Sequence, residues 1–512
     1  MTSPSEIAVP DLPLSEHVLV HGRPDRPALI DGETGEVLTY GELDERSRRF
    51  AAGLRRVAGP GDVLALVSHN RPGWAVACYG ALRAGLRVAP LSPLLTAAEL
   101  AAQFRASGAR VVVTSDRVAA AVRDAAARVG VRHVHSLDGE LPGAAGPLGP
   151  ADATAVLATT SGTTGLPKIA QLTHRNLVAN LEQHQAISPV TEHVVFCATI
   201  PFCHLYGFTL ILSAGLRGGA TVVTTARFDL AGYLRILRRY GVTRGHFAPP
   251  LVAALAQAPG PAGYDLPVLR DAVCGAAPVD LALLARAEER IGGPIRQGYG
   301  MTEAGPGTHF PYAAEFGRTP AGSVGRPVPD TRHRVVDPES GVDVPAGEPG
   351  ELWVAGPQVM RGYLGDAEAT ARTVTGGWLR TGDLVRVDAE GFHWVVDRLK
   401  DLIKYKGYQV APAEVEAVLR THSCVQAAAV VGVPDPVAGE RPHAFVIPRG
   451  DVTEEALLAW VGERVAPYKR IRSAEFVTAL PISPAGKIAR GVLRRRAAPV
   501  PGNPHEGRIE RH

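Results

Sequence analysis

The chain has 512 residues, of which 46% are hydrophobic and 21% charged, the proportions of a globular protein of about two to four domains. Its formal net charge of +3 is too small to favour nucleic acid or an anionic membrane as a partner. The five cysteines form no CxxC pair and lie among apolar or small residues, so we expect reduced core residues rather than disulfides or a zinc site.

The N-terminus carries no basic segment followed by an apolar run, so no signal peptide is expected. The most apolar stretch, residues 202–216, is interrupted by His204 and is shorter than the ~20 residues that span a bilayer. These features predict a cytoplasmic enzyme without a membrane span.

Short β-branched runs bounded by glycine or polar residues predict buried strands in the first half of the chain. Strands of this kind that alternate with helices favour an α/β architecture with parallel sheets. The expected strands are 63–67, 110–114, 155–158 and 220–224, and the expected helices are 40–57 and 230–240. The Gly- and Pro-rich segment 137–150 is expected to be a surface loop.

The pattern changes after about residue 325, where short strands and Gly/Pro turns predict a β-rich subdomain over 324–396. Residues 397–406 are charged and lack an apolar period, which suits a hinge, and 408–496 suit a compact α+β segment. A helix is expected at 412–419, because Pro412 fits a first helical turn. The predicted organisation is therefore a large N-terminal domain (1–398), a small mobile C-terminal domain (399–500) and a disordered tail (501–512).

A Ser/Thr/Gly-rich segment, TTSGTTGLPK at 159–168, directly follows the expected strand 155–158. Its glycines allow backbone N–H groups to converge on an anion, its hydroxyls add donors, and Lys168 adds a positive charge. The spacing is not that of the GxxxxGK[ST] loop, so a P-loop kinase or ATPase is disfavoured. A flexible linker would not need a Pro-Lys ending before an amphipathic segment. By itself the segment indicates anion binding.

The segment SGTTGLPK with the following LTHRNLVAN resembles the phosphate-loop signature of the adenylate-forming superfamily, which includes acyl-CoA ligases, peptide-synthetase adenylation domains and beetle luciferases. The resemblance extends from about residue 15 to 496 and is greatest to coumarate– and cinnamate–CoA ligases. Further matches in the family's order are PFCHLYG (201–207), CGAAP (274–278), QGYGMTE (297–303), GELWVAGP (350–357), GYL (362–364), TGD (381–383), DRLKDLIKYKGYQVAPAEVE (397–416) and PISPAGKI (481–488).

The resemblance implies that a carboxylic acid and ATP form an acyl-adenylate with Mg2+, and that coenzyme A then accepts the acyl group. Because two anions must meet in the first step, catalysis depends on positioning and on neutralising charge. The implied nucleotide-binding residues are Ser161, Gly162, Thr163, Thr164, Gly165, Lys168, Gly275, Ala276, Ala277, Pro278, Tyr299, Gly300, Asp383 and Arg398.

Individual roles follow from the same resemblance. Thr302 would contact the α-phosphate, Glu303 would hold Mg2+, and Tyr299 would lie against the adenine. Asp383 would accept hydrogen bonds from the ribose hydroxyls with help from Arg398. Lys487, in the loop of PISPAGKI, would bridge the carboxylate and α-phosphate oxygens.

The second half-reaction needs a thiol and, in the family, a swing of the C-terminal domain. Lys400 and Asp401 match the hinge positions, and Lys404 and Gly407 match the loop that lines the pantetheine tunnel, although a charged run can also be a solvated turn. His204 matches a residue between the carboxylate site and the thiol tunnel, where it would position or gate; a lone histidine in an apolar run is otherwise usually a core residue.

The acyl pocket of the coumarate–CoA ligases maps onto Tyr206, Gly275, Gly300, Pro306 and Gly307. No acidic residue occurs between 201 and 226, so a buried substrate ammonium would be unpaired there, at a high cost. We therefore expect an aryl, arylacrylic or medium-length acyl substrate.

Three positions depart from the family pattern. Ile169 stands where glycine is usual, which is expected to stiffen the phosphate loop. Gly307 and His309 replace bulkier apolar residues, which is expected to enlarge or polarise the far end of the pocket.

The main alternative is a stand-alone enzyme that loads the acid onto the phosphopantetheine arm of a carrier protein. A non-catalytic nucleotide-binding protein on the same fold also remains open, because fold does not ensure function. A luciferase-like oxidase shares the motifs, but the chain does not end in the Ser-Lys-Leu address.

Overall fold

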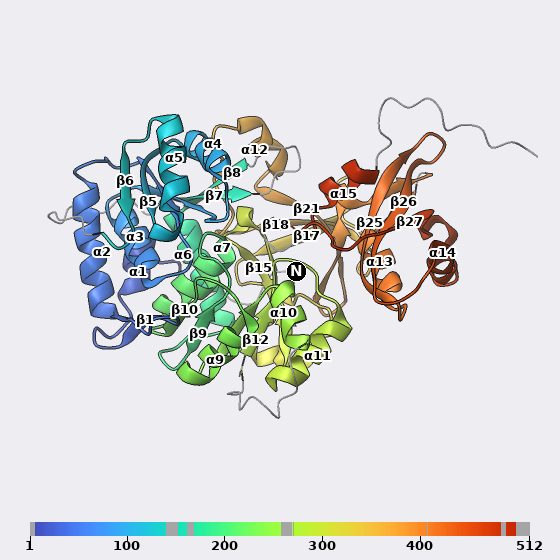
Figure 1. The fold of residues 1–512 in the computed structure, drawn as a ribbon, viewed down its shortest axis with the longest axis horizontal. Coiled ribbons are helices and arrows are strands. Elements are labelled where there is room, and N and C mark those ends of the chain that lie inside the picture. Colours follow the sequence, from blue (N-terminus) through green and yellow to red (C-terminus); the bar gives the residue numbers. More distant parts are fainter. Residues whose placement is uncertain are drawn as a thin grey trace, which may run out of the picture. The chain divides into compact units, whose positions relative to one another are not determined.

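The computed structural model describes residues 6–139, 152–160, 168–257, 269, 271–406, 408–482 and 488–497. These residues form two compact units, which Figure 1 shows with their elements labelled. The N-terminal unit is drawn from residues 1–381 and 386–394, and the C-terminal unit from 382–385 and 395–512. The chain passes between them within two strands, β21 (Trp378–Val387) and β22 (His393–Arg398), whereas the sequence predicts a single boundary at 398.

Two seven-stranded sheets organise the N-terminal unit, and each is largely parallel. The first has the order β13-β12-β11-β9-β10-β1-β2, in which only β2 is antiparallel to its neighbour. Its strands are β1 (Pro27–Asp31), β2 (Val37–Thr39), β9 (Val195–Ala198), β10 (Thr221–Thr224), β11 (Arg244–Phe247), β12 (Asp271–Cys274) and β13 (Ile295–Gln297).

The second sheet has the order β19-β8-β7-β4-β3-β5-β6, with antiparallel pairing at β7–β8 and β8–β19. Its strands are β3 (Val63–Val67), β4 (Arg87–Leu91), β5 (Ala109–Thr114), β6 (His133–Ser136), β7 (Thr154–Thr160), β8 (Lys168–Thr173) and β19 (Gly362–Tyr363). The five residues of β3 are all buried, which explains why this strand has an unbroken apolar sequence.

Helices of the N-terminal unit lie beside these sheets (Figure 1), and half of the twelve described begin at hydroxyl or carboxylate caps. Thr39 and Thr173, for example, accept hydrogen bonds from the third backbone N–H of α2 and α6. The helices are α1 (Leu14–Leu19), α2 (Tyr40–Leu54), α3 (Pro72–Arg83), α4 (Ala97–Ser107), α5 (Ala119–Val129), α6 (His174–Ile187), α7 (Leu205–Gly207), α8 (Ala214–Arg217), α9 (Leu230–Tyr240), α10 (Pro249–Ala256), α11 (Leu281–Ile291) and α12 (Ala367–Thr373).

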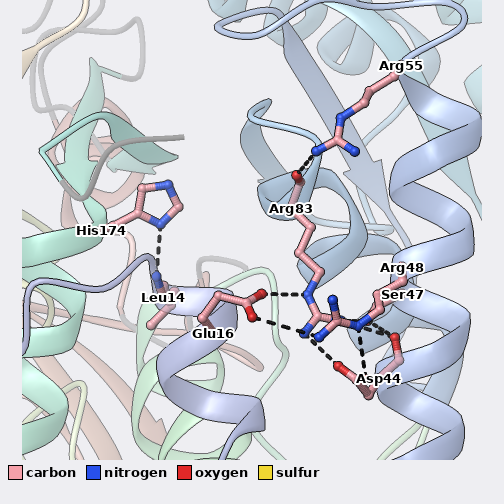
Figure 2. A network of polar contacts seen from close by, with 8 residues as sticks. All are labelled: Leu14, Glu16, Asp44, Ser47, Arg48, Arg55, Arg83 and His174. Carbon is pink, nitrogen blue, oxygen red and sulfur yellow. Dashed lines mark hydrogen bonds and ion pairs between the residues drawn. The ribbon is translucent and has the colours of Figure 1, made fainter. Parts of the chain in front are cut away.

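One buried arginine connects the first three helices (Figure 2). Arg83, at the end of α3, is 3% exposed and pairs with Glu16 of α1 at 2.8 Å and with Asp44 of α2 at 2.7 Å. Its guanidinium also donates to the Ser47 hydroxyl at 2.7 Å. A buried charge of this kind needs all of its partners, because removing one leaves another without compensation.

The remaining strands are mostly antiparallel, and they begin at Tyr299, earlier than the β-rich subdomain predicted over 324–396. A three-stranded sheet contains β14 (Tyr299–Gly300), β15 (Gly307–Phe310) and β16 (Arg326–Pro327). A five-stranded sheet contains β17 (Arg332–Val336), β18 (Gly350–Ala355), β20 (Val374–Thr375), β21 (Trp378–Val387) and β22 (His393–Arg398).

The C-terminal unit has one five-stranded sheet and a separate apolar core that includes Val415, Val430 and Val446. Its strands are β23 (Ile403–Tyr405), β24 (Tyr408–Val410), β25 (Val425–Asp435), β26 (Gly439–Pro448) and β27 (Ser473–Phe476), and its helices are α13 (Pro412–Arg420), α14 (Glu454–Gly462) and α15 (Arg490–Ala497). The predicted fold class, a large α/β N-terminal domain with a β-rich part and a small α+β C-terminal domain, is confirmed. The predicted tail, 501–512, lies outside the described residues.

Two other expectations concern the whole chain. All five cysteines are free thiols, as expected, but only Cys78, Cys197 and Cys274 are core residues, since Cys203 and Cys424 are half-buried. Within the described ranges, no helix is both long and apolar enough to cross a membrane.

Candidate active site

The ends of the parallel strands collect the residues that the motifs single out. In the first sheet, His204 follows β9, Gly275 follows β12, and Tyr299 follows β13. These strands are parallel, so their carboxyl ends lie at one edge, the usual position of a ligand site in an open α/β sheet. The sheet topology thus brings together residues that are far apart in the sequence.

A charged cluster, consisting of Lys168, Glu303 and Tyr363, lies in the N-terminal unit. The Tyr363 hydroxyl donates a hydrogen bond to Glu303 Oε1 at 2.7 Å. The Lys168 ammonium lies over the Tyr363 ring, 4.9 Å from its centroid. Burial, and next to it the negative charge of Glu303, raises the pKa of Tyr363, so its hydroxyl stays protonated as a donor.

Local backbone structure fixes each member of this cluster. Lys168 begins β8, and Tyr363 lies in β19, which pairs with β8 so that Tyr363 is opposite Ala170. Glu303 lies in a 3-10 turn, Thr302–Ala304, and its carbonyl accepts a hydrogen bond from the Met360 N–H at 2.8 Å. Thr302, the predicted α-phosphate contact, is therefore next to the carboxylate.

A second predicted pair lies in the C-terminal unit. Arg398 Nε is 3.0 Å from Asp383 Oδ1, and Asp383 is 2% exposed while Arg398 remains partly open to solvent. The guanidinium thereby holds the carboxylate in one orientation. The sequence motifs containing these residues are separated by about fifteen positions, and the ion pair unites them.

The predicted adenine and tail residues occupy the ends of β12 to β15. Ala276 has a φ of 76°, a left-handed conformation that is rare outside glycine and frequent at functional sites. The residues on either side of it, Gly275 and Ala277, have little side chain, and Pro278 is exposed. Tyr299 packs edge-on against His309, with 5.8 Å between ring centroids.

Tyr206 follows His204 in α7 and turns toward the β11 and β12 ends. Its hydroxyl donates to the Val273 carbonyl at 3.2 Å and lies 3.3 Å from His246 Nδ1. The loop before it is tight: a Cβ on Gly207 would be 2.4 Å from the Pro201 carbonyl oxygen. His204 itself caps α7 and is half-buried, so the structure places it beside Tyr206 on a constrained loop.

The predicted pocket position Gly307 is filled from another element. A Cβ at Gly307 would be 2.0 Å from His184 Nε2, so the imidazole of α6 occupies the place of a side chain. Gly300 is also constrained, since its Cβ would be 2.0 Å from the Pro306 carbonyl oxygen. Beside its Cα, Gly307 therefore leaves no additional space, because the polar imidazole of His184 closes that space.

Helix α6 supplies functional candidates that the sequence analysis missed. Asn180 clamps Gly307, donating to its carbonyl at 2.8 Å and accepting from its N–H at 3.0 Å. His184 is buried, and burial lowers its pKa to about 3, so it is neutral at physiological pH. The available signal was a set of polar residues, Asn180, Gln183 and His184, at the i, i+3, i+4 spacing of one helix face.

His309 belongs to a cluster of three histidines with His333 and His393, of which His309 and His393 are buried and His333 is half-buried. Ring centroids are 4.2 Å apart for His309–His393 and 4.7 Å for His333–His393. Burial lowers all three pKa values, to about 4 for His333 and about 3 for His393. His309 therefore adds a neutral polar group behind Tyr299. Within the described residues, no group of His, Cys, Asp or Glu has the arrangement of a metal site.

Ile169 has a packing explanation. It is buried in β8 against Val63, Ala89 and Leu157, and its carbonyl accepts a hydrogen bond from Leu364. It is thus a core residue of the second sheet, directly after the phosphate segment.

The predicted hinge and tunnel residues lie in the C-terminal unit. Lys400 and Asp401 form the turn after β22, and Arg494 binds both, at 3.2 Å to the Lys400 carbonyl and 2.9 Å to Asp401 Oδ1. Lys404 is exposed in β23. Seven other predicted residues lie outside the described ranges, and their roles stay predictions: Ser161, Gly162, Thr163, Thr164, Gly165, Gly407 and Lys487.

Comparison with known proteins agrees with this arrangement. Residues 17–364 match the model of the AMP-binding enzyme family, and residues 414–487 match the AMP-binding enzyme C-terminal domain. The chain is 40% identical to 4-coumarate–CoA ligase 3 of Oryza sativa subsp. japonica, over 92% of this chain and 90% of the relative.

Solved structures give the same picture. o-Succinylbenzoate CoA synthetase from Bacillus subtilis, in complex with its acyl-adenylate intermediate, is 29% identical with a TM-score of 0.83, covering 95% of this chain and 98% of that one. The amide bond synthetase McbA from Marinactinospora thermotolerans is 31% identical with a TM-score of 0.85, covering 94% and 99%. The chain belongs to the AMP-binding, adenylate-forming family of acid–CoA ligases.

Proposed function

We propose that this enzyme converts an aryl, arylacrylic or medium-length carboxylic acid to its acyl-AMP with ATP and Mg2+, and then to its thioester with coenzyme A. The observation that carries the proposal is the charged cluster, in which Lys168, Tyr363 and Glu303 are already in contact. A cation over the ring of a tyrosine and a carboxylate bound to the hydroxyl of the same tyrosine suit a polyphosphate with a bound divalent ion.

The first half-reaction joins a carboxylate oxygen to the α-phosphorus of ATP and breaks the bond to pyrophosphate. Lys168 would hold phosphate oxygens on the leaving side, and Lys487 would bridge the two reacting anions. Asp383, oriented by Arg398, would accept hydrogen bonds from the ribose. These contacts position the two substrates and offset their repulsion.

Glu303 fits a magnesium ligand, because Mg2+ binds few protein carboxylates and completes its shell with phosphate oxygens and water. The Tyr363 hydrogen bond fixes one carboxylate oxygen, as an outer-sphere partner of a metal ligand does. When bound, the ion would neutralise charge on the phosphates.

In the second half-reaction, the thiol sulfur forms a bond to the acyl carbonyl, AMP leaves with the electron pair, and the thiol proton passes to solvent. His204 would position the thiol, and Lys404 and Gly407 would line its path. The small hinge at Lys400 and Asp401 would permit the change between the two half-reactions.

The predicted acyl pocket with the histidines beside it (Tyr206, Gly307, His184 and His246), here called the tail site, favours a substrate without an ammonium. Asp271, a buried carboxylate near His246, already pairs with Arg244 at 2.8 Å. The imidazoles of His184 and His246 are neutral, since burial lowers both pKa values to about 3. An aryl or acyl tail can pack against such groups without bringing an unpaired charge into the site.

An acid panel tests the proposal through pyrophosphate release, measured with and without coenzyme A. Acid-dependent release and a CoA thioester product are expected, and Lys487→Ala should lower release by roughly 10²-fold or more. Wild-type release from that variant would contradict the assignment of Lys487.

The acceptor of the acyl group has one main alternative to coenzyme A, the phosphopantetheine arm of a carrier protein. The assay should therefore include a phosphopantetheinylated carrier protein. An amine belongs in the same panel, because one similar structure is an amide bond synthetase. Acyl transfer only to the carrier protein would replace coenzyme A as the acceptor while leaving the adenylation step intact.

A further inference from the structure

The helical segment that follows His204 contains a π-helix, Phe208–Ser213, which lies between α7 and α8 without a break. At its end, the Ala214 N–H donates to the carbonyls of Ile211 and Thr209, and Thr209 is five positions earlier. The first residue of the π-helix instead donates to the His204 carbonyl, four positions earlier, as in an α-helix. Such wide turns are rare, occur mostly inside α-helices and are frequently found at functional sites.

Close packing fixes both ends of this segment. At the start, a Cβ on Gly207 would be 2.4 Å from the Pro201 carbonyl oxygen. At the end, a Cβ on Gly215 would be 2.7 Å from Cγ2 of Val222 in β10. Because neither end has room to slide, the additional residue of the wide turn has to be accommodated between the two glycines.

The π-helix borders a small cavity that adjoins the tail site. It packs against α6, and a cavity of about 20 Å³ lies there. Leu210 and Ala214 line this cavity together with Leu181 and His184 of α6, and His246 also contributes to the lining. A volume of this size holds about one water molecule. Since His184 and His246 belong to the tail site, the cavity extends the space for the tail of the acid by about one small group.

The lining of the cavity carries no unpaired charge. Arg217 and Arg244 also contribute to it, but they already pair with Glu182 and Asp271, each at 2.8 Å. The imidazoles that line it are neutral. The end of an apolar chain or of an aromatic ring therefore suits this space better than a charged group does.

We propose that the π-helix determines how long a tail this enzyme accepts: its wide turn keeps the space beside Leu210 and Ala214 open, and the end of a longer tail enters it. The inference rests on the proposed function and narrows its substrate class to arylacrylic and medium-length acids, in preference to benzoic acids. A segment with one residue fewer would have α-helical spacing between the same two fixed ends, and the space would close.

Two variants test this role across an acid panel of graded tail length, with pyrophosphate release as the readout. Deletion of Thr209 shortens the segment by one residue, and Ala214→Val fills the cavity at unchanged length. Both should lower kcat/KM for the longest acids that the wild type accepts by roughly tenfold or more, the effect of about one methylene in an apolar pocket. The loss should decrease with decreasing tail length, and the KM for ATP should stay the same.

Ala186→Val on α6 is the matched control for Ala214→Val. It makes the same change in a helix, with the same decrease in helix propensity, at an exposed position that does not line the cavity. It should leave the dependence of kcat/KM on tail length unchanged. In thermal unfolding, Ala214→Val should resemble this control, because its side chain enters empty space.

A wild-type dependence on tail length in Ala214→Val would overturn the inference, even if the deletion variant does not fold. An equal loss for short and long acids would also overturn it, because the segment would then only support the fold. Absence of acid-dependent pyrophosphate release from the wild type would instead defeat the proposed function itself.

Discussion

The phosphate side and the tail side of the N-terminal unit are built from different kinds of groups. On the phosphate side, Lys168, Tyr363 and Glu303 keep opposite charges close together. On the tail side, His184 and His246 are neutral and almost fully buried, and Asp271 is neutralised by Arg244. The first region is organised to receive charge, and the second to receive a tail that has none. The phosphate side therefore serves the adenylation chemistry that is common to all acids, and the tail side serves the selection of one acid over another.

Glu303→Gln should produce the largest effect, because it removes the negative charge from the charged cluster while keeping the shape of the side chain. We expect pyrophosphate release to fall by roughly 10²- to 10³-fold, the scale of losing one transition-state electrostatic contact. The assay should use saturating acid and a range of Mg2+ concentrations. Retained wild-type activity would show that the carboxylate is not needed on the phosphate side.

Gly307→Val should test the tail side alone. Its side chain would collide with His184 Nε2, so the overpacking should lower folding stability by about 1–3 kcal/mol, and displacement of the ring should raise the KM for bulky acids. The double variant Gly307→Val/His184→Ala should recover much of the lost KM, since it removes the colliding ring. If the effects of Gly307→Val and His184→Ala on KM simply add in the double variant, the two residues do not form one shared wall of the tail site.

Tyr363→Phe should sharpen the comparison on the phosphate side. It removes the hydrogen bond to Glu303 but keeps the aromatic ring under Lys168. A hydrogen bond to a charged group contributes about 1.5–3 kcal/mol, so release should slow by at least roughly tenfold, and the Mg2+ requirement should rise. A change in acid preference instead would place Tyr363 on the tail side.

The pH dependence of stability should report the histidines with lowered pKa values, and the contribution of any single one should be the smallest effect. Their folded-state pKa values lie near 3 to 4, below the ordinary 6.5, so the unfolded chain binds more protons between these limits. Stability should therefore be constant above pH 6.5 and fall as the pH drops toward 4, by up to about 1.4 kcal/mol per pH unit for each such histidine.

A matched pair of variants isolates this effect in thermal unfolding at pH 7.5, 6.5 and 5.5. His393→Gln should reduce the acid-side slope, whereas His193→Gln should not, because the His193 side chain is 80% exposed. Equal slopes for wild type and His393→Gln would mean that other groups cause the acid sensitivity.

Local periodicity predicted several elements well. The helix expected at 230–240 is α9 (Leu230–Tyr240), and the strand expected at 63–67 is β3 (Val63–Val67). The helix expected at 40–57 ends earlier, at Leu54, because residues 55–57 form turns that lead into Gly59 and Pro60. Strand order and the division at β21 and β22 could not be predicted, since they depend on pairings between distant segments.

The same distinction applies to the candidate site. Glu303, Asp383 and Arg398 belong to contiguous motifs, and a motif can be read without knowing the fold. His184 and Asn180 act on Gly307 from more than 120 positions away. Nothing in the residues next to Gly307 indicates that a helix fills its empty side. For Ile169, the neighbouring sequence suggested a role in stiffening the phosphate loop. In the structure it is a core side chain packed in the second sheet.

One continuous segment, residues 168–187, starts with Lys168 in β8, passes the cap Thr173, and ends with the tail-side residues of α6. Helical geometry turns the chain by about 100° per residue, so one residue inserted between Thr173 and Asn180 would rotate both Asn180 and His184 away from Gly307. The length of this segment therefore determines which side chains of α6 face Gly307, and through them which acids bind. Exchanging the inward residues of α6 at constant length offers a route to new acid preferences that leaves the nucleotide residues untouched.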